Sequence, residues 1–142
     1  MSVDLYVFLE RRKLPAAKQL NAAFDSVGLN LRIQSDDNWG NSGVTVERKN
    51  NDGEWADFSF LPIDDNFKEM AAEAGKTAAS CDLVAEFSFH RDEELAIAMP
   101  TALLLAQISD GIFYDPQEGE YFCGAKLKKH ITKLKDEDWG IM

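Results

Sequence analysis

Residues Leu103 to Phe122, LLLAQISDGIFYDPQEGEYF, form the clearest local pattern in this chain of 142 residues. The apolar run over 102–108 predicts a buried helix, which Asp110-Gly111 would end. Ile112–Tyr114 would follow as a short core strand. The stretch 115–119, DPQEG, would then turn the chain into Tyr121-Phe122. The rest of the fold is most easily arranged around this helix and hairpin.

The chain before this stretch begins with a predicted strand and a predicted helix. Val3–Leu9 is rich in β-branched and aromatic residues, which is typical of a central strand. Pro15 suits the first turn of a helix, and Gly28 would end that helix. The expected apolar face of the helix consists of Ala16, Leu20, Ala23, Phe24 and Val27.

Alternating apolar and polar residues predict three strands after this helix, over 29–34, 44–48 and 55–60. Asn50-Asn51-Asp52-Gly53 would form a tight turn between the last two, because Asp-Gly favours positive φ. Strands that are joined by such a short turn pair antiparallel. The middle of the chain therefore predicts antiparallel hairpins.

Asp64-Asp65 would cap a helix over 66–79. Residues 82–90 predict a strand, and residues 126–134 predict a last helix with Leu127, Ile131 and Leu134 inward. The segment 91–99 fits either a short strand or an early helical turn. Pro100 favours the extended alternative, because a residue before proline avoids the α region.

These elements predict an α+β fold of ferredoxin-like character, with helices packed on one face of an antiparallel sheet. Strand, helix, strand and hairpin occur in this order over 3–48 and again over 82–122, so we expect two β-α-β-β units. The length suits a single domain over 1–142.

Composition excludes several classes of protein. A net charge of -10 argues against nucleic-acid binding, which needs clustered Lys and Arg. No apolar run approaches the roughly 20 residues of a membrane span, and the first residues have the reverse of a secretory signal's order. We therefore expect no membrane partner and a cytoplasmic location, with Cys81 and Cys123 as reduced thiols.

Candidate reaction and metal sites are weak in this sequence. The loop from Asp36 resembles a calcium loop with Glu47 at its twelfth place, but Asn41 replaces the required glycine and both flanks predict strands. His90 could act as a base, as in a hydrolase, yet no GxSxG, HExxH or CxxC sequence occurs. We predict no metal, no cofactor and no enzymatic activity.

Acidic residues are concentrated in two segments. Residues 35–65 contain eight Asp and Glu against two basic residues, and residues 92–120 contain seven with no Lys or Arg. Such surfaces suit a basic protein partner, which the charge would steer and a buried indole would anchor. Trp39 lies in a loop and is predicted to be exposed, whereas Trp55 lies on a strand and is predicted to be in the core.

The leading interpretation is therefore an acidic protein-binding module. The interface we predict comprises Asp36, Asp37, Trp39, Asp52 and Glu54. An alternative surface is the turn that carries Asp115, Glu118 and Glu120.

The 103–122 stretch, with its Ala-Leu-rich helix, Asp110-Gly111, strand and DPQEG turn, resembles small acidic bacterial immunity-type proteins of uncharacterised families. The resemblance implies a stoichiometric inhibitor that covers a toxin domain, with no catalytic residue. A different interpretation stays open, in which the chain is a small-ligand-binding sensor with a pocket on a ferredoxin-like sheet. Its pocket would be lined by Phe87, Phe89 and Tyr121.

Overall fold

The computed structural model describes residues 3–33, 39, 43–49, 51–73, 80–89 and 92–133, without the side chains of 3, 51–54, 92 and 93. Its strands are β1 (Val3–Leu9), β2 (Leu31–Ile33), β3 (Val44–Arg48), β4 (Asn51–Pro62), β5 (Leu83–Phe89), β6 (Ile112–Asp115) and β7 (Glu120–Phe122). Its helices are the short η1 (Arg11–Lys13) and α1 (Ala17–Ser26), α2 (Asp65–Glu73), α3 (Asp92–Ile108) and α4 (Gly124–Lys133).

The strands form one open sheet in the order β2-β3-β4-β5-β1-β6-β7, and every neighbouring pair is antiparallel. The predicted α+β class with an antiparallel sheet is confirmed. Two units of strand, helix and hairpin also occur. The hairpin of the first unit lies beyond β5, the first strand of the second unit. The hairpin of the second unit lies beyond β1, the first strand of the first unit. The β2–β3 hairpin leads through β4 to β5, and the β6–β7 hairpin lies against β1. The ferredoxin-like detail is not confirmed by this order.

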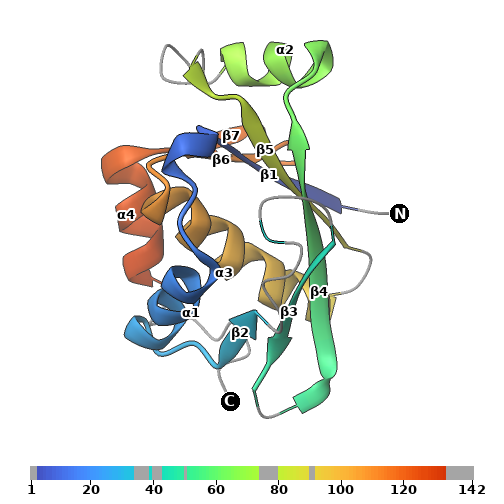
Figure 1. Cartoon of the computed structure of the whole chain (residues 1–142), viewed down its shortest axis with the longest axis vertical. Helices are drawn as coiled ribbons and strands as arrows, with labels where there is room; N and C mark the ends of the chain where they lie inside the picture. Colours follow the sequence, from blue (N-terminus) through green and yellow to red (C-terminus); the bar gives the residue numbers. More distant parts are fainter. Residues whose placement is uncertain are drawn as a thin grey trace.

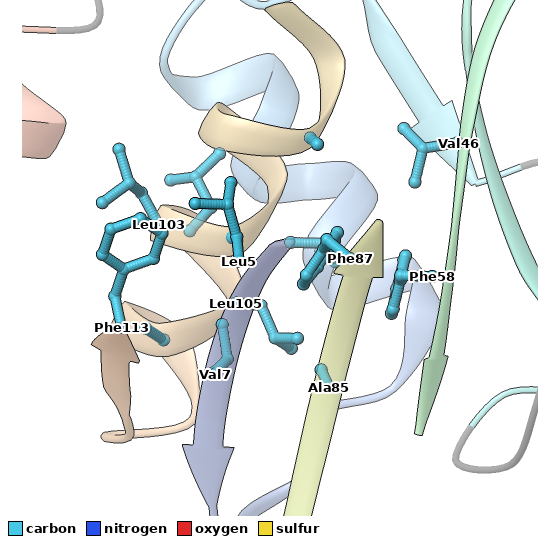
Figure 2. Packing of buried hydrophobic residues seen from close by; sticks show 14 of the residues in the cluster. Leu5, Val7, Val46, Phe58, Ala85, Phe87, Leu103, Leu105 and Phe113 are labelled. Atoms are coloured by element: carbon cyan, nitrogen blue, oxygen red, sulfur yellow. The ribbon is translucent and has the colours of Figure 1, made fainter. Parts of the chain in front are cut away.

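Three helices, α1, α3 and α4, cover one face of the sheet (Figure 1). Alternate residues of the central strands face them, because side chains of a strand point to opposite faces. Figure 2 shows Leu5 and Val7 of β1 beside Ala85 and Phe87 of β5, with α3 packed over them. Fully burying side chains of this size stabilises a fold by about 1.5–3 kcal/mol each. This side holds most of the core.

The remaining helix, α2, packs on the second face, so the expectation of helices on one face holds for three of the four. Its Ala71 joins a smaller apolar cluster with Phe8 and Val84, and Phe67 lies edge-on to Tyr6 at 5.7 Å between ring centroids. Asp64 caps this helix, as predicted, by accepting a hydrogen bond from the backbone N–H of Phe67 at 3.0 Å. The part of the predicted helix beyond Glu73 lies outside the described residues until Ser80.

The preference for an extended segment before Pro100 is wrong, because α3 runs through this proline. Burial of Ile97, Ala98 and the turns after Pro100 stabilises the helix against the lost backbone N–H. The hydroxyl of Thr101 also donates to the carbonyl of Ile97 at 2.7 Å across the same turn. Tertiary packing therefore overrides the local signal.

Helices α1 and α3 end in the same way. Gly28 and Asp110 adopt positive φ, and the next N–H reaches back to Phe24 O at 2.9 Å and to Ala106 O at 2.7 Å, respectively. The predicted stop at Asp110-Gly111 is confirmed, with Asp110 as the left-handed residue. Gly111 is required for a different reason, since a Cβ there would lie 2.6 Å from Phe8 O.

Some boundaries differ from the predictions. On α1, Ala17 is buried and Ala16 is exposed. Strand β4 begins at Asn51, inside the predicted turn, and its register against β3 shifts between Glu47 and Arg48. Glu47 pairs with Trp55 and the next residue, Arg48, pairs with Asn51, so β4 has extra residues that bulge out of this pairing. Local turn signals do not reveal such a bulge.

Gly111→Ala should destabilise the protein by about 1–3 kcal/mol, because the added methyl group must displace the backbone of β1. Urea denaturation monitored by far-UV circular dichroism measures the free energy of unfolding. Gly119→Asn is the control, because Gly119 has φ of 65° with open space around it and Asn tolerates that conformation. Equal stability losses in the two variants would contradict the close approach of Gly111 to β1.

Candidate functional site

Helix α2 covers only part of the second sheet face, and we call the part that it does not cover the open face. It is formed by Asp4, Arg32, Thr45, Glu47, Trp55, Asp57, Ser59, Glu86 and Ser88. The registers place these residues in rows that cross the strands, on the side opposite the helix-covered core. The open face carries four carboxylates and one guanidinium, so it is acidic.

Trp55 is the apolar centre of one row. Its side chain is 47% exposed, an unusual fraction for a tryptophan on a strand. Glu47 lies directly opposite it on β3, and Arg32 on β2 donates to the Glu47 carboxylate at 2.9 and 3.0 Å. The ion pair fixes the position of Glu47 beside the indole, so that the ring stands between a paired carboxylate and the acids of the next row.

The next row carries acids on two strands, β4 and β1. Asp57 accepts a hydrogen bond from the Thr45 hydroxyl at 2.6 Å. Asp4 lies opposite Ser88 on the central strands and accepts a hydrogen bond from its hydroxyl. These hydroxyl groups hold the carboxylates in place without neutralising them.

A third row begins with Ser59 and Glu86 and continues into Tyr6, Tyr114 and Tyr121. Burial, with Asp4 as a second cause, raises the pKa of Glu86. Burial also raises the pKa of Tyr6 to about 12, with Asp4 and Glu86 adding to the effect. The negative potential of the open face therefore extends to its inner edge.

The tyrosines form the boundary with α2. Tyr114 and Tyr121 stack at 4.2 Å, and the Tyr121 hydroxyl is 2.9 Å from Met70 O and 3.0 Å from a Glu73 carboxylate oxygen. Burial is the main cause that raises the pKa of Tyr121, followed by the hydrogen bond with Glu73. These contacts attach α2 to β7, while the charged rows beyond Tyr6 stay uncovered by this helix.

The structure does not gather the predicted interface residues into one described site. Asp36 and Asp37 lie outside the described residues, and Asp52 and Glu54 belong to β4 with side chains that are not described. The residues of the alternative surface lie on the β6–β7 hairpin, where Glu118 and Glu120 are exposed and Asp115 is half-buried. The Asp115 carboxylate accepts from the N–H of Gln117 at 3.1 Å and therefore shapes the turn.

Trp39 and Trp55 each lie in the environment that was predicted for the other. Trp39 is half-buried on the helix-covered side, where its ring lies 5.2 Å from Phe60 and its Nε1 donates to Pro15 O at 2.7 Å. Trp55, predicted to be in the core, is exposed. The alternation in WADFSF contains this signal, because Trp55 shares its face with Asp57 and Ser59, whereas Ala56, Phe58 and Phe60 share the other.

Other candidate groups do not form a reaction site among the described residues. Phe87 and Phe89 are buried in the main core and Tyr121 lies on the second face, so they line no common pocket. Burial raises the pKa of the Cys81 thiol to about 11, and Cys123 is an exposed thiol. His90 is outside the described part of the chain, and that part contains no group of three metal-ligating side chains.

Within the described ranges, no helix has the length and apolar character needed to cross a membrane. No protein-family model, curated protein or solved structure matches the chain.

Glu86→Gln should increase the free energy of unfolding more at neutral pH than in acid. The raised pKa means that the folded protein binds the Glu86 proton more tightly than the unfolded chain does. Folding stability is therefore lost as the pH rises above about 4.5 and through the folded-state pKa, and the amide removes this loss.

Urea denaturation of both proteins between acid and neutral pH measures the effect, with the exposed Glu120→Gln as control. A Glu86→Gln variant that loses more stability at neutral pH than in acid would show that the carboxylate is stabilised by its surroundings instead of penalised.

Proposed function

We propose that this protein is an acidic protein-binding module that engages a basic protein through its open face. The observation that carries the proposal is the exposed indole of Trp55, which lies in a row with Glu47 and next to Asp57. Aromatic residues surrounded by polar groups are frequent anchors of protein interfaces, because one ring buries a large apolar area.

The charges and the anchor have different roles in this proposal. Asp4, Asp57 and Glu86 make no ion pair within the described part of the chain. A cationic surface would be attracted to them before contact, which raises the association rate at low salt. Trp55 would then supply short-range affinity when its ring becomes buried, and truncation of such an anchor typically costs at least about 2 kcal/mol.

The acidic character and the resemblance of residues 103–122 to immunity-type proteins support a more specific role. We propose that the basic partner is a toxin domain and that binding neutralises it stoichiometrically. An inhibitor of this kind needs a complementary surface and no reaction centre. The role is compatible with a cytoplasmic location.

The partner can be captured from the source cell with a photoreactive amino acid in place of Ser88, an exposed residue of the open face, which leaves Trp55 intact. We expect the cross-linked partner to be a basic protein whose affinity for the wild-type chain falls as salt is raised. Trp55→Ala should weaken binding by at least about 30-fold, the ratio that corresponds to about 2 kcal/mol. Calorimetry with the purified partner measures both effects.

The matched control is Lys18→Ala, an exposed change on α1 at the helix-covered side. If Trp55→Ala and Lys18→Ala bind the purified partner equally well, the open face is not the interface. The toxin assignment has a separate test, in which co-expressed wild-type protein restores the growth of cells that produce the partner and Trp55→Ala does not. A partner that is harmless when produced alone would remove the toxin assignment and leave the binding proposal intact.

A further inference from the structure

Helix α4 has a basic outer surface in an otherwise acidic chain. Its ten residues include four lysines and no Asp or Glu. Leu127 and Ile131 are buried, so Lys126, Lys129 and Lys133 occupy the opposite side of the helix. Their spacing of three and four residues forms a stripe about 10 Å long. We call these three residues the α4 stripe.

The α4 stripe is not neutralised by the rest of the described chain. None of its lysines forms an ion pair with a described residue. Lys126 instead lies over the ring of Phe122, with its Nζ 4.9 Å from the centroid. With a net charge of -10 on the whole chain, this concentration of ammonium groups without an ion pair to the described residues marks a surface suited to a local acidic partner.

A complementary stripe exists on α2. Asp65, Glu69 and Glu73 are exposed and recur every four residues over about 12 Å, so they follow one side of the helix. Ala71 and Phe67 face the sheet instead. We call the three acids the α2 stripe. It has the same number of charges as the α4 stripe, with the opposite sign and nearly the same length.

Both helices flank the same edge strand. Tyr121 of β7 contacts Met70 and Glu73 of α2, whereas Phe122 stacks on His130 of α4 at 4.0 Å between centroids. Successive residues of a strand point to opposite faces, so α2 and α4 lie on opposite sides of the sheet at this edge. In the described sheet, β7 pairs with β6 alone.

We propose that a second copy of this chain binds at the β7 edge, with the α4 stripe of each copy against the α2 stripe of the other. A twofold axis that lies in the plane of the sheet exchanges its two faces, so it brings each basic helix opposite an acidic one. An axis perpendicular to the sheet would instead bring like charges together. Repulsion between the two acidic chains is largely screened beyond about 8 Å at physiological salt, whereas charges in contact are screened less.

This association goes beyond the proposed function and leaves the open face free. Sedimentation velocity on the purified full chain at concentrations up to about 1 mM should show a weak dimer. Its dissociation constant should increase when NaCl is raised from about 50 mM to about 500 mM. A protein that stays monomeric over this whole range would overturn the proposal.

Charge reversal provides the sharper test. Lys129→Glu with Lys133→Glu, and separately Asp65→Lys with Glu69→Lys, should each weaken self-association at least about tenfold, because like charges then meet. An equimolar mixture of these two variants should form a 1:1 heterodimer, since both helix contacts are then complementary. Circular dichroism establishes that each variant is folded before mixing.

The control variant, Lys18→Glu with Lys49→Glu, changes the net charge as much as Lys129→Glu with Lys133→Glu does. Its two residues lie on α1 and directly after β3, at the end of the sheet opposite to β7. We expect it to dimerise much as the wild type does. A mixture of the two reversed variants that fails to associate would overturn the proposed pairing. So would loss of the dimer in Trp55→Ala, which would place the contact on the open face instead.

Discussion

The antiparallel pairing of β1 with β5 is the constraint on which the rest of this structure depends. Seven residue pairs, from Val3–Phe89 to Leu9–Leu83, join two strands that are distant in sequence. The β2–β4 strands attach to β5 and the β6–β7 hairpin to β1, so the pair aligns both halves of the sheet. A shift of one residue in one of these strands would exchange the two faces of that strand, which places Tyr6 and Phe8 where Leu5 and Val7 now pack.

The two faces differ because helices seal one of them and α2 covers only part of the other. On the sealed face, α3 lies against both halves and stays helical through Pro100 because its surroundings are apolar. On the second face, the tyrosine row holds α2 at β7 and the charged rows continue toward Trp55. The carboxyl of Glu86 is half-buried, and because this burial raises its pKa, its ionisation at neutral pH costs stability.

Local patterns predicted those elements whose signals are strong and continuous. The alternation in β3 and β5, the β-branched and aromatic residues of β1 and the stop at Asp110-Gly111 were sufficient to place three strands and a helix end. The sequence did not predict which face each helix covers, because α2 has an apolar stripe like that of α1. It also misplaced the indoles: the environment of Trp39 depends on Pro15 and Phe60, far away in the chain, whereas the exposure of Trp55 could have been deduced from its alternation with Ala56 and Phe58.

The central claim is that the partly covered second face presents an indole to solvent while the helix-covered side encloses another. Acrylamide quenching of fluorescence in two variants, each retaining one of Trp55 and Trp39 with phenylalanine at the other tryptophan positions, tests it directly. We predict that Trp55 emits at longer wavelength and is quenched strongly, and that Trp39 emits at shorter wavelength and is quenched weakly. Protected emission from Trp55 with accessible emission from Trp39 would contradict the assignment of the two faces.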